Sequence, residues 1–89
     1  MKASVEISLY PLEENYKNRI IEFIERLKES GKIDVITNGM STQLFGEFDD
    51  IMDVLKSEIG KELEKHRTMA ILKIGDGLLR PEGIPDSLK

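Results

Sequence analysis

The order in which strand-like and helix-like periodicities follow one another constrains this fold more than any other feature. Apolar and polar residues alternate between Ala3 and Leu9, which is typical of a strand with one covered face. Apolar residues recur at helical spacing between residues 13 and 30 and again between residues 48 and 67. In the second of these helices the predicted buried stripe is Ile51, Leu55, Ile59 and Leu63. Further strands are predicted at residues 33–37, 41–47 and 68–74.

The resulting order is strand, helix, strand, strand, helix, strand, which is the split-βαβ arrangement. Because crossovers between parallel strands are right-handed, both helices are placed on one face of a four-stranded antiparallel sheet. We therefore predict an α+β fold, the ferredoxin-like βαββαβ sandwich. A single domain is expected over residues 1–75, since 89 residues suffice for one core, and residues 76–89 are expected to form a C-terminal tail. Asn38 and Gly39 predict a tight hairpin turn with positive φ values, and Pro11 predicts the end of the first strand.

Composition excludes several classes of function. The chain has no cysteine, which excludes disulfides, thiolate nucleophiles and cysteine-based zinc sites. Its net charge is −4 and its basic residues interleave with acidic ones, which argues against nucleic acid as a partner. No apolar run has the length of a membrane span, and no signal peptide is predicted at the N-terminus. We therefore expect a cytoplasmic protein with no membrane partner.

No pattern of residues predicts catalysis. His66 is the single histidine and lies at the end of a predicted helix, where the helix dipole stabilises its charged form. The acidic residues near the start of the same helix lack the spacing of a calcium-binding loop, and aspartates are favoured at a helix start. No nucleophile has a base beside it, and no glycine-rich phosphate motif is present. The sequence therefore predicts a protein that is not an enzyme, with no cofactor and no metal ion.

The face of the sheet that the helices leave uncovered is the expected functional surface. Alternation places Glu6, Glu47 and Phe45 on this open face. A carboxylate there reaches water, pairs with a base of another subunit or meets a donor of a ligand. Further candidates for ligand binding are Ser8, Tyr10, Ser41, Thr42 and Gln43. For Thr42 the alternative is a position beneath a helix, where it would serve as a strand-forming residue.

Two segments resemble a known family. Residues 40–52, Met-Ser-Thr-Gln-Leu-Phe-Gly-Glu-Phe-Asp-Asp-Ile-Met, are similar to a motif of the thiamine-binding protein family, the YkoF-like group. Residues 3–12 resemble the first strand of that family, which also runs into Pro-Leu. The resemblance covers roughly residues 2–74. It implies a ferredoxin-like fold, dimers or tetramers, and binding of thiamine or its hydroxymethylpyrimidine portion without catalysis. Ser41, Thr42 and Glu47 match the motif by position.

Two functional hypotheses follow. In the first, which depends on the resemblance, the chain is a carrier or sensor of thiamine or hydroxymethylpyrimidine. Its carboxylates, hydrogen-bonding side chains and aromatic rings on the open face would then surround the ligand, and an aromatic ring would stack on it with a cation–π contribution of about 0.5–2 kcal/mol. In the second, the chain is a regulatory or protein-interaction module whose open face mediates oligomerisation only.

Overall fold

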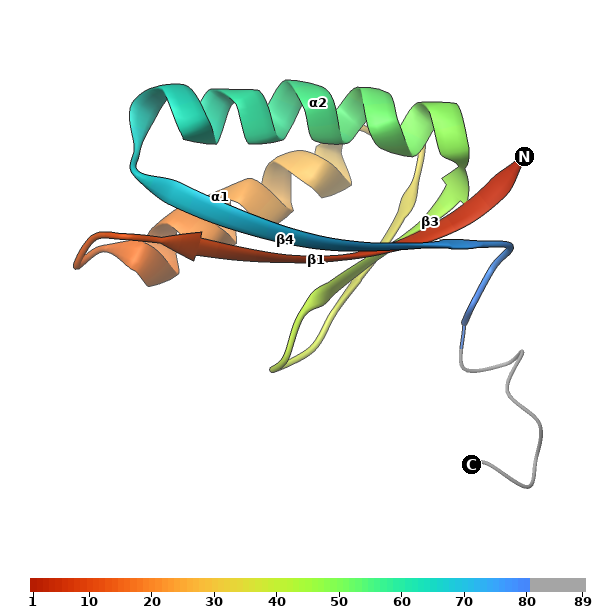
Figure 1. The fold of residues 1–89 in the computed structure, drawn as a ribbon, viewed down its shortest axis with the longest axis horizontal. Coiled ribbons are helices and arrows are strands. Elements are labelled where there is room, and N and C mark those ends of the chain that lie inside the picture. The colour runs from red at the N-terminus through yellow and green to blue at the C-terminus, as the bar shows by residue number, and fades with distance from the viewer. Residues whose placement is uncertain (81–89) are drawn as a thin grey trace.

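The computed structural model describes residues 1–80 of the 89-residue chain. Its elements are β1 (Lys2–Pro11), α1 (Tyr16–Glu29), β2 (Asp34–Thr37), β3 (Thr42–Glu47), α2 (Phe48–Lys65) and β4 (Thr68–Asp76). This is the predicted βαββαβ order, and Figure 1 shows its arrangement in space. Among the helices of residues 1–80, none combines the length and the apolar character that a membrane span requires.

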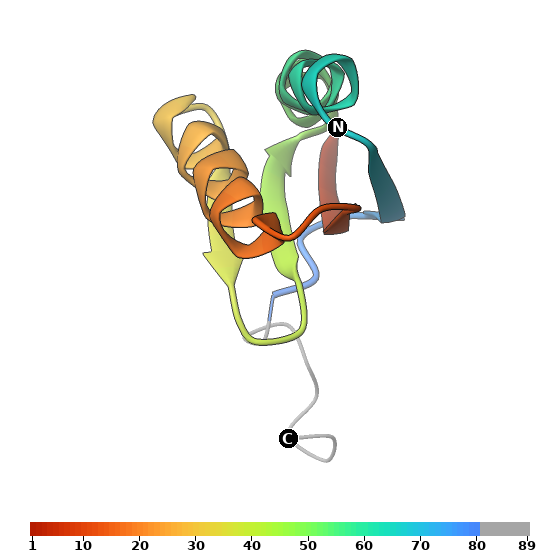
Figure 2. The same ribbon diagram turned by 90° about the vertical axis from the view of Figure 1, so that its left-hand side faces the viewer.

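The strands form one antiparallel sheet in the order β2-β3-β1-β4. β1 is therefore a central strand, with β3 on one side and β4 on the other. Figure 2 shows that α1 and α2 lie on the same side of this sheet. The ferredoxin-like α+β fold predicted from the sequence is confirmed.

The core lies between the sheet and the two helices. The alternating residues Ala3, Val5, Ile7 and Leu9 of β1 point into it, and Leu9, the most exposed of them, is only 7% exposed. They pack against buried residues of β3 and of both helices, which are Leu44, Phe23, Leu27, Ile51 and Leu55. Each such large apolar side chain contributes about 1.5–3 kcal/mol when it is fully buried. The alternation seen in the sequence thus fixes which face of β1 meets the helices.

The buried stripe of α2 differs from the predicted one. Leu63 was expected to be buried, but it is 56% exposed. Glu58 and Glu62 are buried instead, with exposures of 7% and 4%. Arg26 of α1 contacts both carboxylates, and a paired charge costs far less to bury than an isolated one. The prediction was wrong at this end of α2 because a residue of the other helix decides which side of α2 is buried.

The β2–β3 hairpin forms at the predicted position, but its turn is of another kind. Gly39 does not have a positive φ angle. The side-chain Oδ1 of Asn38 accepts hydrogen bonds from the backbone N–H groups of Met40 and Ser41, at 2.8 and 3.1 Å. Asn38 therefore shapes the turn through its side chain, and not through the left-handed backbone that the Asn-Gly pair predicts.

Hydrogen bonds along β1 go alternately to its two neighbours, as expected in an antiparallel sheet. At its N-terminal end, the oxygen of Met1 accepts from the N–H of Phe48, which follows β3. The oxygen of Lys2 accepts from the N–H of Gly77, which follows β4. Odd-numbered residues of β1 therefore bond toward β3, and even-numbered residues bond toward β4.

This alternation explains why β1 continues through Pro11, where the sequence predicted its end. Pro11 pairs with Thr68 of β4. As an odd-numbered residue, Pro11 occupies a position whose N–H would point toward β3. Because β3 begins only at Thr42, which is paired with Ile7, no residue of β3 lies opposite Pro11 to accept that bond. No ladder hydrogen bond is lost, so the proline is accommodated inside the strand.

The open face is not fully uncovered, in contrast to the prediction. Residues 77–80, which we call the C-terminal strap, follow β4 and lie against this face. The hydroxyl of Ser4 donates to the oxygen of Gly77 at 2.7 Å and accepts from the N–H of Leu79 at 2.8 Å. Leu79 packs so closely on β4 that a Cβ atom at Gly75 would lie 2.8 Å from its Cδ1. The beginning of the predicted tail is thus held on the sheet.

Arg80 of the C-terminal strap covers an aromatic ring on the open face. Its guanidinium carbon lies 4.8 Å from the centroid of the Phe45 ring, and its Nη2 pairs with the carboxylate of Asp34. Phe45 is consequently only 2% exposed. Residues 81–89, the rest of the predicted tail, lie outside the described part of the chain.

Candidate functional site

A difference in length between two neighbouring strands leaves a gap in the sheet. The ladder between β1 and β3 ends at the pair Ile7–Thr42. The ladder between β1 and β4 continues to the pair Pro11–Thr68. Within residues 1–80, the segment 8–11 of β1 therefore has no strand beside it on the β3 side. We call this gap the edge notch.

A groove of about 470 Å³ lies at the edge notch, between α1 and the β2–β3 hairpin, and Figure 2 shows the hairpin beside α1. Pockets for small ligands commonly have volumes of about 300–1,000 Å³. One wall of this edge groove is apolar and comes from β1 and α1, with Ile7, Leu9, Tyr16, Ile20, Phe23 and Ile24. The other wall is the hairpin from Thr37 to Thr42. The edge groove is therefore a concave site with one apolar wall and one largely polar wall.

The main chain of Leu9 faces the edge groove. As an odd-numbered residue of β1, Leu9 directs its N–H and C=O toward the β3 side, beyond the last pair of the ladder. The next position in that register is Met40, which lies in the hairpin turn and whose N–H bonds to the side chain of Asn38. In the described part of the chain neither main-chain group of Leu9 has a hydrogen-bond partner. An unused donor and an unused acceptor thus lie side by side.

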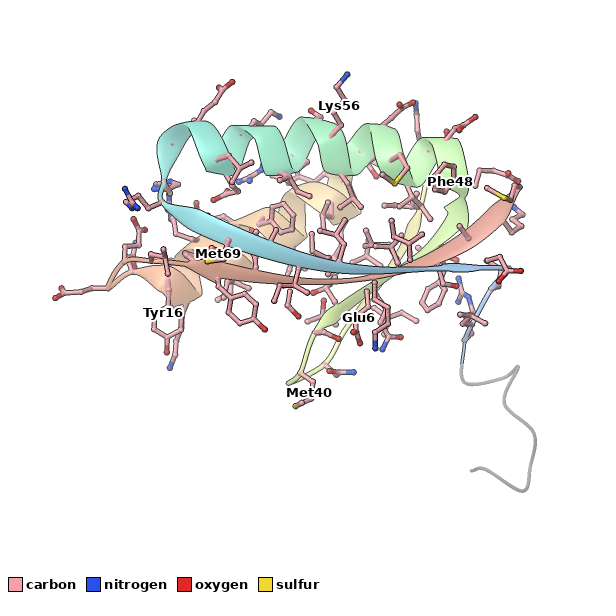
Figure 3. The ribbon with its side chains drawn as sticks, viewed as in Figure 1. Glu6, Tyr16, Met40, Phe48, Lys56 and Met69 are labelled. Carbon is pink, nitrogen blue, oxygen red and sulfur yellow. The ribbon has the colours of Figure 1, made fainter. Side chains whose placement is uncertain are left out.

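Polar side chains gather at the edge notch on the open face. Glu6 and Gln43 lie opposite each other in the β1–β3 register. The hydroxyl of Ser41 donates to Oε2 of Glu6 at 3.0 Å, and Ser8 follows Glu6 on the same face of β1. Figure 3 shows Glu6 projecting away from the helices, and its Oε1 lies 3.9 Å from Nζ of Lys73 on β4. We call Glu6, Ser8, Ser41 and Gln43 the polar cluster, and all four are residues that the sequence proposed for the site.

Two further predicted residues border the edge groove from different sides. Thr42 lies on the helix side of the sheet, is 5% exposed, and has its hydroxyl 3.1 Å from that of Thr37. The position beneath a helix, which the sequence left open for Thr42, is the one observed. Tyr10 lies on the open face opposite Met69 and is 51% exposed. Both residues line the edge groove.

Phe45 belongs to a separate hollow on the open face. This second pocket has a volume of about 310 Å³ and includes Glu6 and Gln43 from the polar cluster, with Leu79 of the C-terminal strap at its side. One face of the Phe45 ring is already occupied by Arg80. The structure therefore separates Phe45 from the edge groove.

Glu47 lies at the end of β3 that is far from the edge groove. Its carboxylate accepts a hydrogen bond from the N-terminal ammonium group of Met1 at 2.9 Å and pairs with Nζ of Lys2 at 3.0 Å. The hydrogen bond from the N-terminus, followed by the hydrogen bond and the charge of Lys2, lowers the pKa of Glu47 below its ordinary value. Glu47 is thus bound within its own end of the sheet and is not brought together with the polar cluster.

Sequence reasoning missed parts of the edge groove. Tyr16 falls within the first predicted helix and was not proposed for the site, but it is 44% exposed at the groove. Asn38 was regarded only as a turn residue and Met40 only as the first residue of the segment that resembles the family, and the main chain of Leu9 was not considered. The local pattern contained no signal for the edge notch, because the notch depends on the register between β1 and β3.

His66 is held away from the edge groove by two side chains. Its Nε2 lies 3.0 Å from Nη1 of Arg19, and its Nδ1 lies 3.3 Å from the carboxylate of Glu13. These contacts join the end of α2 to the start of α1. Among residues 1–80, no three histidine, aspartate or glutamate side chains form a group that could hold a metal ion.

Comparisons with known proteins agree with this fold. A hypothetical protein from Methanocaldococcus jannascii is 28% identical, with a TM-score of 0.75, over 98% of this chain and 92% of that one. A protein from Thermotoga maritima, assigned provisionally to thiamine biosynthesis or salvage, is 24% identical with a TM-score of 0.76, over 99% of this chain and 94% of that one. A domain of unknown function from Bacillus cereus is 22% identical with a TM-score of 0.70, over 100% of this chain and 86% of that one. No curated protein matches the chain.

The family assignment rests on a match that includes residues of all four strands. The model of the YkoF-related family matches residues 2–74, from the start of β1 into the last strand, β4. This range includes the edge notch, the polar cluster and the segment 40–52 on which the resemblance was noted. The chain therefore belongs to the YkoF-related family.

Proposed function

We propose that this protein binds thiamine or its hydroxymethylpyrimidine portion in the edge groove, as a cytoplasmic carrier or sensor. The observation that carries the proposal is the edge groove itself, which has an apolar wall on one side and is also lined by Ser8 and Ser41 of the polar cluster, with Glu6 hydrogen-bonded to Ser41. Membership of the YkoF-related family supports this choice of ligand, as does the likeness to a protein assigned provisionally to thiamine biosynthesis or salvage.

The two halves of thiamine have different requirements, and the edge groove offers a different wall for each. The flat aminopyrimidine lies against Tyr16, which is 44% exposed, because aromatic rings bury a large area and pack well on other flat rings. The thiazolium ring carries a positive charge and lies toward the polar cluster. There Glu6 supplies the negative charge, and Ser41 holds its carboxylate in place. Glu6 is 42% exposed, so its contribution to affinity is modest and the apolar wall contributes more.

Isothermal titration calorimetry with thiamine and with hydroxymethylpyrimidine tests the proposal. Both ligands are expected to give saturable heat. Glu6→Gln is expected to weaken thiamine about two- to fivefold, as for other partly exposed charge pairs, with less effect on the neutral pyrimidine. Glu47→Gln is the matched control, because it makes the same change at the far end of β3, and it should leave both affinities unaltered. The absence of heat and of any thermal shift at millimolar ligand would contradict the proposal.

A variant that fills the edge groove separates binding there from binding elsewhere. Ile20 lines the apolar wall from α1 and is only partly buried. Ile20→Trp is expected to occupy the space of the pyrimidine and to abolish the heat of binding. Circular dichroism and thermal unfolding would establish that the variant is folded. Undiminished binding by a folded Ile20→Trp protein would place the ligand outside the edge groove.

We further propose that binding proceeds without chemical change. The polar cluster supports this, because the one base that contacts its hydroxyls is the carboxylate of Glu6 at Ser41, and a carboxylate is too weak a base to remove the proton of a serine hydroxyl. Mass spectrometry after prolonged incubation with stoichiometric protein should recover thiamine intact. Release of separate pyrimidine and thiazole products would show that the protein is an enzyme.

A second candidate function, assembly through the open face, rests on a different observation. Tyr10, Met69 and Ile71 of β1 and β4 are 51%, 61% and 60% exposed, and the first two are cross-strand neighbours. Exposed apolar side chains that cluster in this way are typical of protein interfaces. We propose a second copy of the chain as the partner, in a dimer or tetramer. Sedimentation velocity should show an assembly that Ile71→Lys converts to monomer, and a monomeric wild-type protein would exclude it.

A further inference from the structure

We infer that the free main chain of Leu9 recognises the ligand directly, which restricts the ligands of the edge groove to flat heteroaromatic rings with an amino group beside a ring nitrogen. The inference rests on the proposed function, since it concerns how a ligand is held in the edge groove. Its structural basis is the unpaired N–H and C=O of Leu9, which lie at the edge notch between the apolar wall and the polar cluster.

The N–H and C=O groups of Leu9 continue the hydrogen-bonding pattern of Ile7, which is the previous residue of β1 to face β3 with its main-chain groups. In a hydrogen-bonded antiparallel pair, each residue donates its N–H to the partner and accepts at its C=O from the same partner. Ile7 stands in this relation to Thr42, as the last pair between β1 and β3. Leu9 presents the same two groups toward the same side, with no residue of β3 opposite. A ligand with an acceptor and a donor side by side can therefore take the place of the missing partner residue.

The aminopyrimidine edge has the required pattern. Its amino N–H donates to the oxygen of Leu9, and the adjacent ring nitrogen accepts from the N–H of Leu9. In this pose the ring continues the layer of the sheet beside β1. One face of the ring then meets the side chains of α1, with Tyr16 and Ile20 at the wall, and the other face is turned toward the open side of the sheet.

This arrangement predicts discrimination as well as binding. A ring that lacks the amino group would cover the oxygen of Leu9 without providing a donor, and a polar group left unsatisfied on burial is costly. Sites built to hydrogen-bond a ligand reject analogues that lack the bonding group more strongly than apolar pockets reject a change of size. The selectivity of the edge groove thus comes from main-chain atoms, which no side-chain motif in the sequence reveals.

The test compares two probes on the full chain by calorimetry. The first is 4-amino-5-hydroxymethyl-2-methylpyrimidine and the second is the same molecule without the amino group. The second is expected to bind about tenfold more weakly or worse, which is the cost of one lost hydrogen bond with its partner left buried. Equal affinities for the two probes would overturn the inference and leave the proposed function standing. If thiamine and both probes fail to bind, the proposed function fails with it.

Amide hydrogen exchange followed by nuclear magnetic resonance gives a second readout, which needs no variant. In the free protein the amide of Leu9 should exchange much faster than the amide of Ile7, because only Ile7 bonds to β3. Saturation with the amino-substituted probe should slow exchange at Leu9 and leave Ile7 as it was. Exchange at Leu9 that the probe does not alter would overturn the inference. So would protection in the free protein that increases with protein concentration, because a strand of a second copy would then fill the edge notch.

Discussion

Arg26 on α1 and Glu62 on α2 form an ion pair that joins the two helices on the side away from the open face. Nε of Arg26 also lies 3.3 Å from Oε1 of Glu58, so one guanidinium group serves two nearly buried carboxylates. Burial by itself would lower the pKa of Arg26, but the hydrogen bond and charge of Glu62, with those of Glu58, outweigh it and raise the pKa. These contacts thus favour the charged form of the guanidinium over the neutral form.

Arg26→Ala should destabilise the protein by about 2–3 kcal/mol, because it leaves two carboxylates buried without their partner. The expected loss of stability is smaller than the cost of unpairing a fully buried charge, since the side chain of Arg26 is 28% exposed. Lys61→Ala is the control, because Lys61 contacts Glu58 from a position that is 53% exposed and should contribute about 0.5 kcal/mol. Urea denaturation measures both free energies of unfolding. Equal losses for the two variants would refute the role given to Arg26.

Gly60→Ala should stabilise the protein by about 0.5–1 kcal/mol, the difference in helix propensity between glycine and alanine. Gly60 lies inside α2, and a Cβ atom there would meet nothing within 4 Å. Gly31→Ala is the contrasting change, because Gly31 has a φ angle of 70° and alanine in that conformation costs about 1–2 kcal/mol. Thermal unfolding should therefore move in opposite directions for the two variants. A lower melting temperature for Gly60→Ala would show that α2 needs flexibility at this position.

Glu47 should titrate below the ordinary glutamate value of about 4.3, because the N-terminal ammonium group and Lys2 favour its charged form. A lowered folded-state pKa means that the unfolded chain binds this proton more readily. The contribution to stability is then fully present above the ordinary value and is lost as the pH falls through the lowered one. Carbon-detected magnetic resonance of the Glu47 carboxyl group, followed as a function of pH, measures the midpoint of its titration. Acetylation of the N-terminus should raise it, and a midpoint that acetylation does not move would contradict the assigned cause.

Ser4→Ala should release the C-terminal strap from the sheet, because the Ser4 hydroxyl bonds both to Gly77 and to Leu79. The direct measurement is exchange at the amide of Leu79, which should become faster. Ser8→Ala is the control, since it removes a hydroxyl from the same strand and face but leaves the C-terminal strap untouched. Unaltered exchange at Leu79 in the Ser4→Ala protein would mean that packing of the Leu79 side chain on β4 is enough to hold the C-terminal strap on the sheet.

The sequence was sufficient to predict the parts of the structure that depend on local pattern. The alternation of β1 predicted which residues reach the core, and the order of elements predicted the sheet and the side on which both helices lie. The burial of Glu58 and Glu62 could not be predicted from α2, because it depends on Arg26, which is 32 and 36 positions away in the chain. The cover over Phe45 likewise depends on Arg80, a residue distant in sequence.

The candidate site was only partly predictable for the same reason. Alternation placed Glu6, Ser8 and Gln43 correctly on one face of neighbouring strands, and the structure brings them together with Ser41. It also placed Glu47 on that face, but alternation within one strand contains no information on the register between two strands. The separation of Glu47 from Glu6 follows from the register of β1 and β3, which pairs Glu6 with Gln43 and Lys2 with Glu47, and which was not predicted because these two strands are not joined by a turn.

The edge notch exists because β1 has ten residues and β3 has six. It needs no special side chain, only a hairpin that turns back before it reaches the level of Leu9. The ladder between β1 and β3 ends at Ile7, so lengthening both arms of the β2–β3 hairpin by two further pairs would bring a residue of β3 opposite Leu9 and close the groove, with the topology unchanged. The length of one loop is therefore a simple variable by which evolution or a protein engineer can open, narrow or remove a binding site in an otherwise constant sheet.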